Sequence, residues 1–121
     1  MATDIRDRLE WRMGTKTDFL QGSLDLLILK TLEAEPLHGW AVSKRLELLS
    51  HGVLKVNQGS LYPALYRLRD RGLIESKGGV SEEGRPVKVY RVTKSGRAAL
   101  KRERDGWRRF AEAVEAVLAT G

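Results

Sequence analysis

The sequence predicts a mainly α-helical protein with one small β-hairpin and a long C-terminal helix. Apolar residues recur at helical spacing over most of the chain, two short β-prone runs flank a glycine-rich stretch, and residues 94–121 carry an apolar stripe among charges. These patterns divide the chain into a charged arm or short helix at 1–18, where Ile5, Leu9 and Met13 have helical spacing, a compact unit at 19–93 and the C-terminal helix at 94–121. A chain of 121 residues suits one core, to which a second subunit would add stability.

The composition excludes several classes of protein. The chain has no cysteine, which rules out disulfides and thiolate metal sites and favours a reducing cytoplasm. Residues 1–12 are rich in charge and hold no apolar run, unlike a signal peptide, and no later segment has the length of a membrane span. We therefore expect a cytoplasmic protein with no membrane partner.

The charge is distributed unevenly along the chain. The net charge is +6, and the segment from Lys55 to Arg109 holds 15 of the 22 basic residues but only 6 of the 16 acidic ones. Such a segment is typical of a surface that binds a polyanion, although a merely solvated basic face would have the same composition.

The first firm helix is predicted after Phe19. Leu24, Ile28 and Leu32 recur at helical spacing, and Ser23 suits the start of the helix. The apolar residues cover more than one face. We therefore expect part of this helix to meet a second subunit.

A second helix follows a turn at residues 35–39. It is predicted from Trp40 to Ser50, ends at His51-Gly52, and leads through an extended link at 53–56 into the next helix. The residues expected to point inward are Val42, Leu46 and Leu49.

The stretch from Asn57 to Gly72 predicts a short helix with two distinct faces. Gly72 suits the C-terminal stop. Leu61, Leu65 and Leu68 form an apolar stripe, and the other side carries Gln58, Tyr62, Tyr66, Arg67 and Arg69. Two short helices in succession, the second presenting polar groups, are typical of the helix-turn-helix arrangement that binds DNA.

The start of this helix has two candidate caps, Asn57 and Ser60. If Ser60 is the cap, Pro63 lies in the first turn, where its missing N–H costs nothing. If Asn57 is the cap, Pro63 lies deeper and should bend the helix.

Residues 73–77 and 87–92 are predicted strands on either side of a glycine-rich tip at 78–86. This hairpin is the wing of a winged helix. Tyr90 and Val92 should point inward, whereas Lys88 shares their face beyond the edge of the core. Arg85 lies at the tip, where it can reach a phosphate or a minor groove, or remain a solvated loop charge.

A long helix closes the chain. Thr93 suits its cap, and the helix should run over residues 94–119, about 39 Å at the usual rise. Its apolar stripe repeats every seven residues at Leu100, Trp107 and Val114, flanked by Phe110, Ala111, Val117 and Leu118. A small winged unit cannot cover this stripe, so we expect a homodimer in which these helices pair. Glu103 and Gly106 interrupt the stripe, which places the tight contact from Trp107 onward.

Several short motifs together resemble the PadR family of bacterial transcriptional regulators, in its short form with one C-terminal helix. They are Leu-His-Gly-Trp at 37–40, Gly-Ser-Leu-Tyr-Pro-Ala-Leu at 59–65, Gly-Leu-Ile at 72–74, Gly-Arg-Pro at 84–86 and Tyr-Arg-Val-Thr at 90–93. The resemblance covers roughly residues 19–118. It implies a dimeric winged helix-turn-helix repressor that binds double-stranded promoter DNA, with the helix after Asn57 in the major groove and the wings on the backbone.

The resemblance also implies which residues make each contact. The groove-facing candidates are Gln58, Ser60, Tyr62, Pro63 and Tyr66, with Asn57 at the helix start, and the phosphate-contacting candidates are Arg67, Arg69, Arg85 and Lys88. The candidates for the dimer interface are Leu24, Ile28, Trp107, Phe110, Val114, Val117 and Leu118. Two symmetric helices imply a palindromic site with half-sites about 10 base pairs apart.

Trp107 has two interpretations. In some family members, paired tryptophans at the dimer centre bind flat aromatic or cationic drugs, and Trp107 looks equivalent to that tryptophan, which implies a small aromatic effector. Arg104, Arg108 and Arg109 surround it in the sequence, however, and speak against a large apolar pore. We favour Trp107 as an anchor of the dimer interface.

Other functions fit less well. No nucleophile is paired with a base, no glycine-rich loop has phosphate-binding spacing, and His38 and His51 have no companion ligands, so we expect no enzyme, no metal and no cofactor. An RNA-binding protein of this size would need aromatic residues on an open sheet. The remaining alternative is a winged helix that binds protein without sequence-specific DNA binding. It would need an apolar or mixed outer face on the helix after Asn57.

Overall fold

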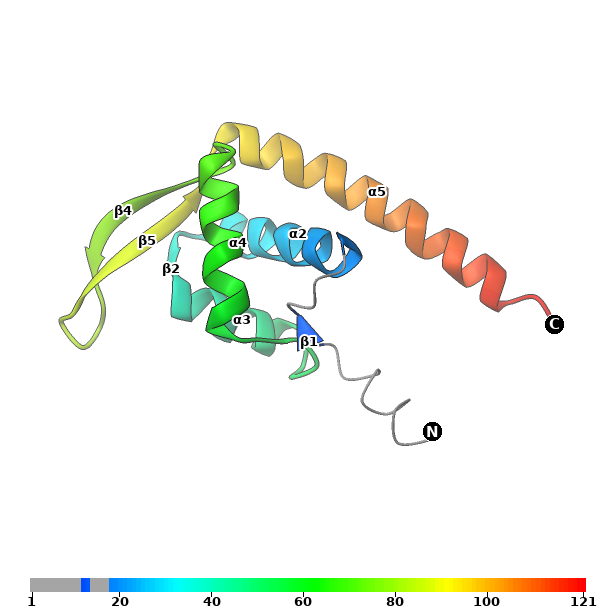
Figure 1. Cartoon of the computed structure of the whole chain (residues 1–121), viewed down its shortest axis with the longest axis horizontal. Helices are drawn as coiled ribbons and strands as arrows, with labels where there is room; N and C mark the ends of the chain where they lie inside the picture. Colours follow the sequence, from blue (N-terminus) through cyan, green and yellow to red (C-terminus); the bar gives the residue numbers. More distant parts are fainter. Residues whose placement is uncertain (1–11, 14–17) are drawn as a thin grey trace.

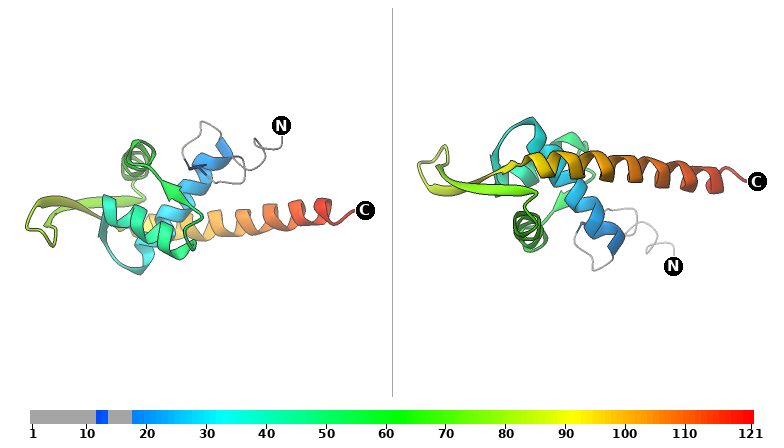
Figure 2. Two further views of the ribbon diagram at one scale, coloured as in Figure 1. Left: turned by 90° about the horizontal axis from the view of Figure 1, so that it is seen from below. Right: turned by 90° about the horizontal axis from the view of Figure 1, so that it is seen from above.

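The computed structural model describes residues 12–13 and 18–121, with side chains from Ser23 onward. The elements in chain order are β1 (Arg12–Met13), α2 (Asp18–Ala34), β2 (Leu37–His38), α3 (Gly39–Leu49), β3 (Lys55–Val56), α4 (Gln58–Asp70), β4 (Ile74–Val80), β5 (Pro86–Val92) and α5 (Lys94–Leu118). Helices α2, α3 and α4 gather into one body, from which the β4–β5 hairpin projects on one side and α5 on the other (Figure 1; Figure 2). This confirms the predicted fold class of a mainly helical winged helix with a long C-terminal helix.

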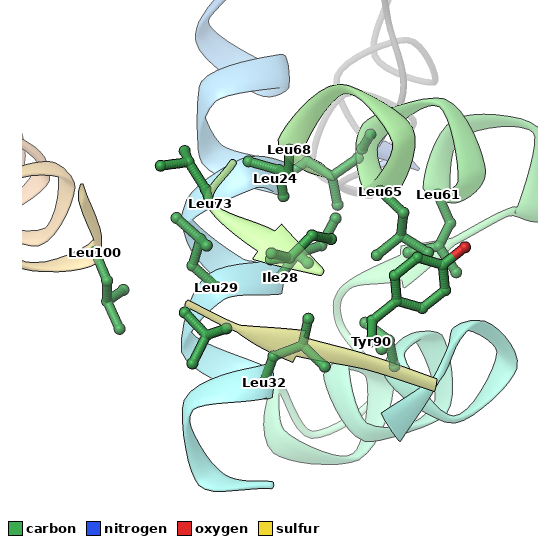
Figure 3. Packing of buried hydrophobic residues seen from close by; sticks show 14 of the residues in the cluster. Leu24, Ile28, Leu29, Leu32, Leu61, Leu65, Leu68, Leu73, Tyr90 and Leu100 are labelled. Carbon is green, nitrogen blue, oxygen red and sulfur yellow. The ribbon is translucent and has the colours of Figure 1, made fainter. Parts of the chain in front are cut away.

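One hydrophobic core holds the body together. Side chains from α2, α4 and β5 meet in its centre, and Leu100 reaches it from α5 (Figure 3). Leu24 and Ile28 of α2 are only 3% and 0% exposed. They were expected at the dimer interface, and this expectation is wrong because neither side chain offers surface to a second chain.

Helices α2 and α3 differ from the prediction in the start of α2 and in the inner face of α3. Helix α2 begins at Asp18, so Ser23 lies inside it. Helix α3 ends as predicted, because His51 and Gly52 have positive φ values of 56° and 80° and their amides donate to the last turn. Leu49 is 61% exposed and does not point inward, because the core contacts of α3 are made by Val42 and Leu46.

The sheet is larger than the predicted hairpin. Strand β5 pairs with β4 on one side and with the two-residue β2 on the other, so Leu37 and His38 form a strand where a turn was expected. Residues 78–80 belong to β4, and the tip is confined to residues 81–85. Gly79 leaves room for the neighbouring strand, because a Cβ there would lie 2.7 Å from Cγ2 of Val89, whose side chain would have to shift.

Before α2, the N-terminal arm is described only at Arg12 and Met13. These residues pair in parallel with Lys55 and Val56 as strands β1 and β3. Met13 is therefore in a strand and not in the short helix predicted for the arm. The rest of that prediction lies outside the described residues.

Helix α5 is joined tightly to the end of α4. Thr93 caps α5 as predicted, its Oγ1 accepting from the amide of Gly96 at 3.0 Å and donating to the carbonyl of Gly72 at 2.7 Å. The amide of Thr93 donates to the carbonyl of Leu73 at 3.0 Å. A Cβ on Gly96 would lie 2.0 Å from that carbonyl oxygen, so only glycine permits this approach. We call residues 72–73 with 93–96 the joint.

The apolar stripe of α5 has two parts. Leu100 is buried in the core, whereas the stripe from Trp107 to Leu118 is exposed on the single chain. Within the described part of the chain, no helix is both long and apolar enough to cross a membrane.

Candidate nucleic-acid interface

Helix α4 begins directly after Asn57. The side-chain Oδ1 of Asn57 accepts a hydrogen bond from the amide of Ser60 at 2.9 Å, so Asn57 is the cap and Ser60 lies inside the helix. Pro63 is consequently in the helix interior, in the deeper of its two predicted positions. Because proline has no N–H, the exposed turn at Gly59 keeps a carbonyl without its usual helical donor.

The far end of α4 is equally well defined. Gly72 adopts a φ of 75°, its amide donates to the carbonyl of Arg69 at 2.9 Å, and the amide of Leu73 donates to the carbonyl of Leu68 at 3.0 Å. This pair of bonds is the Schellman motif. The predicted stop at Gly72 is confirmed.

The two faces of α4 are separated as predicted. Leu61, Leu65 and Leu68 are fully buried, whereas Gln58, Pro63 and Tyr66 are exposed. The rings of Tyr62 and Tyr66 lie 6.1 Å apart, and the guanidinium of Arg69 sits 5.0 Å from the Tyr66 ring centre. This places an aromatic and cationic surface on the outer side of the helix.

Tyr62 is only partly exposed because it packs on the start of α3. A Cβ on Gly39 would lie 2.7 Å from the Tyr62 hydroxyl oxygen, so the glycine makes room for the ring. Tyr62 therefore supports the outer surface of α4 as well as contributing to it.

A hollow of about 380 Å³ lies between the start of α3, the outer side of α4 and the wing. It brings together four of the predicted DNA contacts, Tyr62, Tyr66, Arg85 and Lys88. Its other lining residues are His38, Gly39, Trp40, Ser81, Glu83, Pro86, Val87 and Tyr90. The hollow is open to solvent between two basic side chains of the wing and two tyrosines of α4.

Trp40 and Lys44 of α3 were missed by the sequence analysis. Trp40 is 52% exposed, stacks with His38 at 6.4 Å between ring centres, and carries the Lys44 ammonium 5.2 Å from its ring centre. The available signal was a tryptophan directly after His38-Gly39, at the predicted start of the second helix. These residues extend the aromatic and cationic surface beyond α4.

Arg67 does not join this surface. Its Nη2 lies 2.6 Å from Oδ1 of Asp25 on α2, and Nη1 of Arg71 lies 4.0 Å from the other oxygen of the same carboxylate. Arg67 was expected to contact phosphate, and in the single chain a carboxylate on α2 holds its guanidinium. Asp25 was missed because its partner is far along the chain.

Burial raises the pKa of the Asp25 carboxyl above its ordinary value, and this effect outweighs the hydrogen bond from Arg67 and the charges of Arg67 and Arg71, which lower the pKa. Burial likewise raises the pKa of the Tyr90 hydroxyl in the core, with smaller contributions from the nearby tyrosines. Tyr90 is therefore neutral at pH 7.

The exposed stripe of α5 is the second candidate surface. Its apolar side chains are Trp107, Phe110, Val114, Val117 and Leu118, and the rings of Trp107 and Phe110 lie 6.0 Å apart. A continuous apolar stripe of this kind is typical of a protein contact surface. Among the residues with described positions, no three His, Cys, Asp or Glu side chains gather as metal ligands.

Residues 28–102 match the PadR-like family of transcriptional regulators. Over 97 residues the chain is 37% identical to a transcriptional regulator of Mycobacterium tuberculosis, covering 80% of this chain and 87% of that protein. A PadR-like transcriptional regulator from Bacillus cereus superposes with a TM-score of 0.73 at 28% identity, over 87% of this chain and 100% of that one. A PadR family regulator from Eggerthella lenta gives a TM-score of 0.73 at 28% identity, over 99% and 94%. By both sequence and fold, the chain belongs to the PadR-like family of transcriptional regulators.

Proposed function

We propose that the protein is a homodimeric repressor that binds a palindromic promoter site, with α4 in the major groove and the wing on the neighbouring backbone. The observation that carries the proposal is the surface around the hollow, where exposed polar and aromatic side chains of α4 lie beside Arg85 and Lys88 of the wing. Basic and hydrogen-bonding groups on a slim helix are what major-groove recognition requires. This role places the protein in the cytoplasm.

The outer residues of α4 have separate roles in this proposal. Gln58, Ser60 and Tyr66 face base edges, where a glutamine can bond adenine at two atoms, and Pro63 offers an apolar contact to a thymine methyl group. Arg69, Arg85 and Lys88 contact phosphates, which set affinity and register without reading sequence. Arg67 has no place in this set, because Asp25 engages it.

The exposed stripe of α5 supports the dimer. The side chains from Trp107 to Leu118 pair with the same stripe of a second copy, which buries apolar surface that the single chain leaves in water. Two-fold symmetry then presents two copies of α4 to half-sites about 10 base pairs apart. Trp107 anchors this interface, and a small aromatic effector that wedges beside it would change the angle between the α5 helices.

The protein represses in this proposal by occupying the promoter and excluding the polymerase. The first test is a salt titration of binding to the DNA upstream of its own gene and to a scrambled duplex. We expect tight binding to the promoter with a steep salt slope, and much weaker binding to the scramble. Equal, weak binding to both duplexes would contradict the proposal and favour a winged helix that binds protein.

A further inference from the structure

A largely buried carboxylate of α2 is shared by Arg67 of α4 and by Arg71, the residue that caps the C-terminal end of α4. The Asp25 side chain is only 12% exposed, and its two oxygens face Arg67 at 2.6 Å and Arg71 at 4.0 Å. These arginines lie one turn apart on the side of α4 that faces α2. The arrangement engages two cations at the C-terminal end of the proposed recognition helix.

We propose that Asp25 is a specificity-determining residue, which holds Arg67 and Arg71 away from the DNA backbone so that neither adds sequence-independent affinity. This inference rests on the proposed function, in which α4 contacts DNA. Asp25 thereby sets how strongly the protein prefers its operator to other DNA.

Phosphate contacts add affinity for DNA without adding preference for a sequence. A contact between arginine and phosphate strengthens binding to every sequence, and each one steepens the salt slope by about 0.9. At 0.15 M salt, one such contact corresponds to about fivefold in affinity. Two free arginines beside the groove would therefore raise the affinity for all genomic DNA and reduce the operator's advantage.

The burial of Asp25 fits this role better than a role in stability alone. A carboxylate that is taken out of water gains little net stability from its ion pairs, because desolvation offsets the attraction. The raised pKa of Asp25 has the same cause. The pair nevertheless fixes where two long, flexible side chains point.

The test is the substitution Asp25→Asn, which keeps the size of the side chain and removes its charge. Binding to the promoter duplex and to the scrambled duplex is measured as a function of salt. We expect affinity for the scramble to rise about fivefold or more and its salt slope to steepen by about one to two units, so that the preference for the promoter falls. The triple variant Asp25→Asn, Arg67→Gln, Arg71→Gln should return the scramble affinity to the wild-type value.

The matched control is Glu33→Gln, which makes the same change of charge further along α2. Glu33 is paired with Lys30 on the same helix and with Arg104 on α5, so its loss frees no arginine of α4. We expect its salt slope on the scramble to match that of the wild type. An equal rise in both variants would overturn the inference and leave only an effect of net charge.

A second variant tests the inference if Asp25→Asn does not fold. Arg71→Gln alters a half-exposed side chain, and we expect it to leave the salt slope unchanged because Arg71 does not contact DNA in the wild type. A slope flatter by about one contact would overturn the inference. The proposed function fails separately, if the wild-type protein shows no preference for the promoter.

Discussion

Helix α4 and the C-terminal half of α5 are both amphipathic, but the apolar stripe of α4 is buried and that of α5 is exposed. Leu61, Leu65 and Leu68 of α4 are fully buried against the core, whereas the side chains of the α5 stripe are between 38% exposed, at Val114, and 71% exposed, at Leu118. The same sequence pattern therefore has two physical outcomes. Helix α4 buries its apolar stripe within one chain, whereas α5 leaves the second half of its stripe exposed, and in the proposed dimer a second subunit covers it.

The largest effect is expected from a substitution in the buried stripe of α4. Leu65→Ala removes a fully buried side chain from α4 and should lower the free energy of unfolding by about 2–5 kcal/mol, because it loses burial and leaves a cavity. Urea unfolding followed by circular dichroism measures the change. Leu48→Ala, at an exposed site on α3, is the control and should change stability by less than about 0.5 kcal/mol. Equal losses would mean that the core lies elsewhere.

The exposed side is tested by a charge in the middle of the α5 stripe. Val114→Asp should weaken the proposed dimer by about 3 kcal/mol, more than a hundredfold in the dissociation constant, because it buries an unpaired charge. Sedimentation equilibrium measures the effect. Ala116→Asp makes the same change of charge nearby, outside the stripe, and should leave the dimer intact. A dimer that survives Val114→Asp would show that another surface pairs the subunits.

A smaller effect is expected on the outer side of α4. Tyr66→Ala should lower promoter affinity by about tenfold without changing the dimer or the stability, since one good contact to a base is worth about 1–3 kcal/mol. Fluorescence anisotropy with labelled promoter DNA gives the affinity. Tyr62→Ala should, in addition, lower the melting temperature, because Tyr62 packs on Gly39. If Tyr66→Ala leaves the promoter affinity unchanged, the proposal that α4 lies in the major groove is contradicted.

The smallest expected change is at the wing. Arg85→Gln should weaken binding to promoter and scrambled DNA by the same factor and flatten both salt slopes by about 0.9, because a phosphate contact carries no sequence information. The salt titration measures both slopes. A loss confined to the promoter would instead assign Arg85 to base recognition.

The sequence was most informative where structure depends on neighbouring residues. Gly72 and Thr93 mark helix ends through bonds to residues a few positions away, and both were identified correctly. The choice between Asn57 and Ser60 stayed open, because either side chain can accept an amide hydrogen bond. Only the position of the first turn in the fold decides it.

The errors concern contacts between distant segments. Apolar periodicity shows that Leu24 and Ile28 are covered, but it cannot tell whether the cover is the same chain or a partner. Asp25 and Arg67 are separated by 42 positions, so no local pattern joins them. Strand β2 was missed because two residues carry no periodicity, and its existence depends on the free edge of β5.

The joint has a consequence for how the proposed dimer measures DNA. Residues 72–73 end the helix that meets the bases, residues 93–96 begin the helix that meets the partner, and hydrogen bonds with a glycine-only contact lock the two together. In the proposed dimer, the angle between the two α5 helices then sets the distance between the two α4 helices, because the joint holds α4 and α5 of each subunit in a fixed orientation. In the proposed dimer, α4 consequently determines which bases are recognised, and α5 determines the spacing of the half-sites. Substitutions in α5 can therefore change the spacing without changing the bases that α4 recognises.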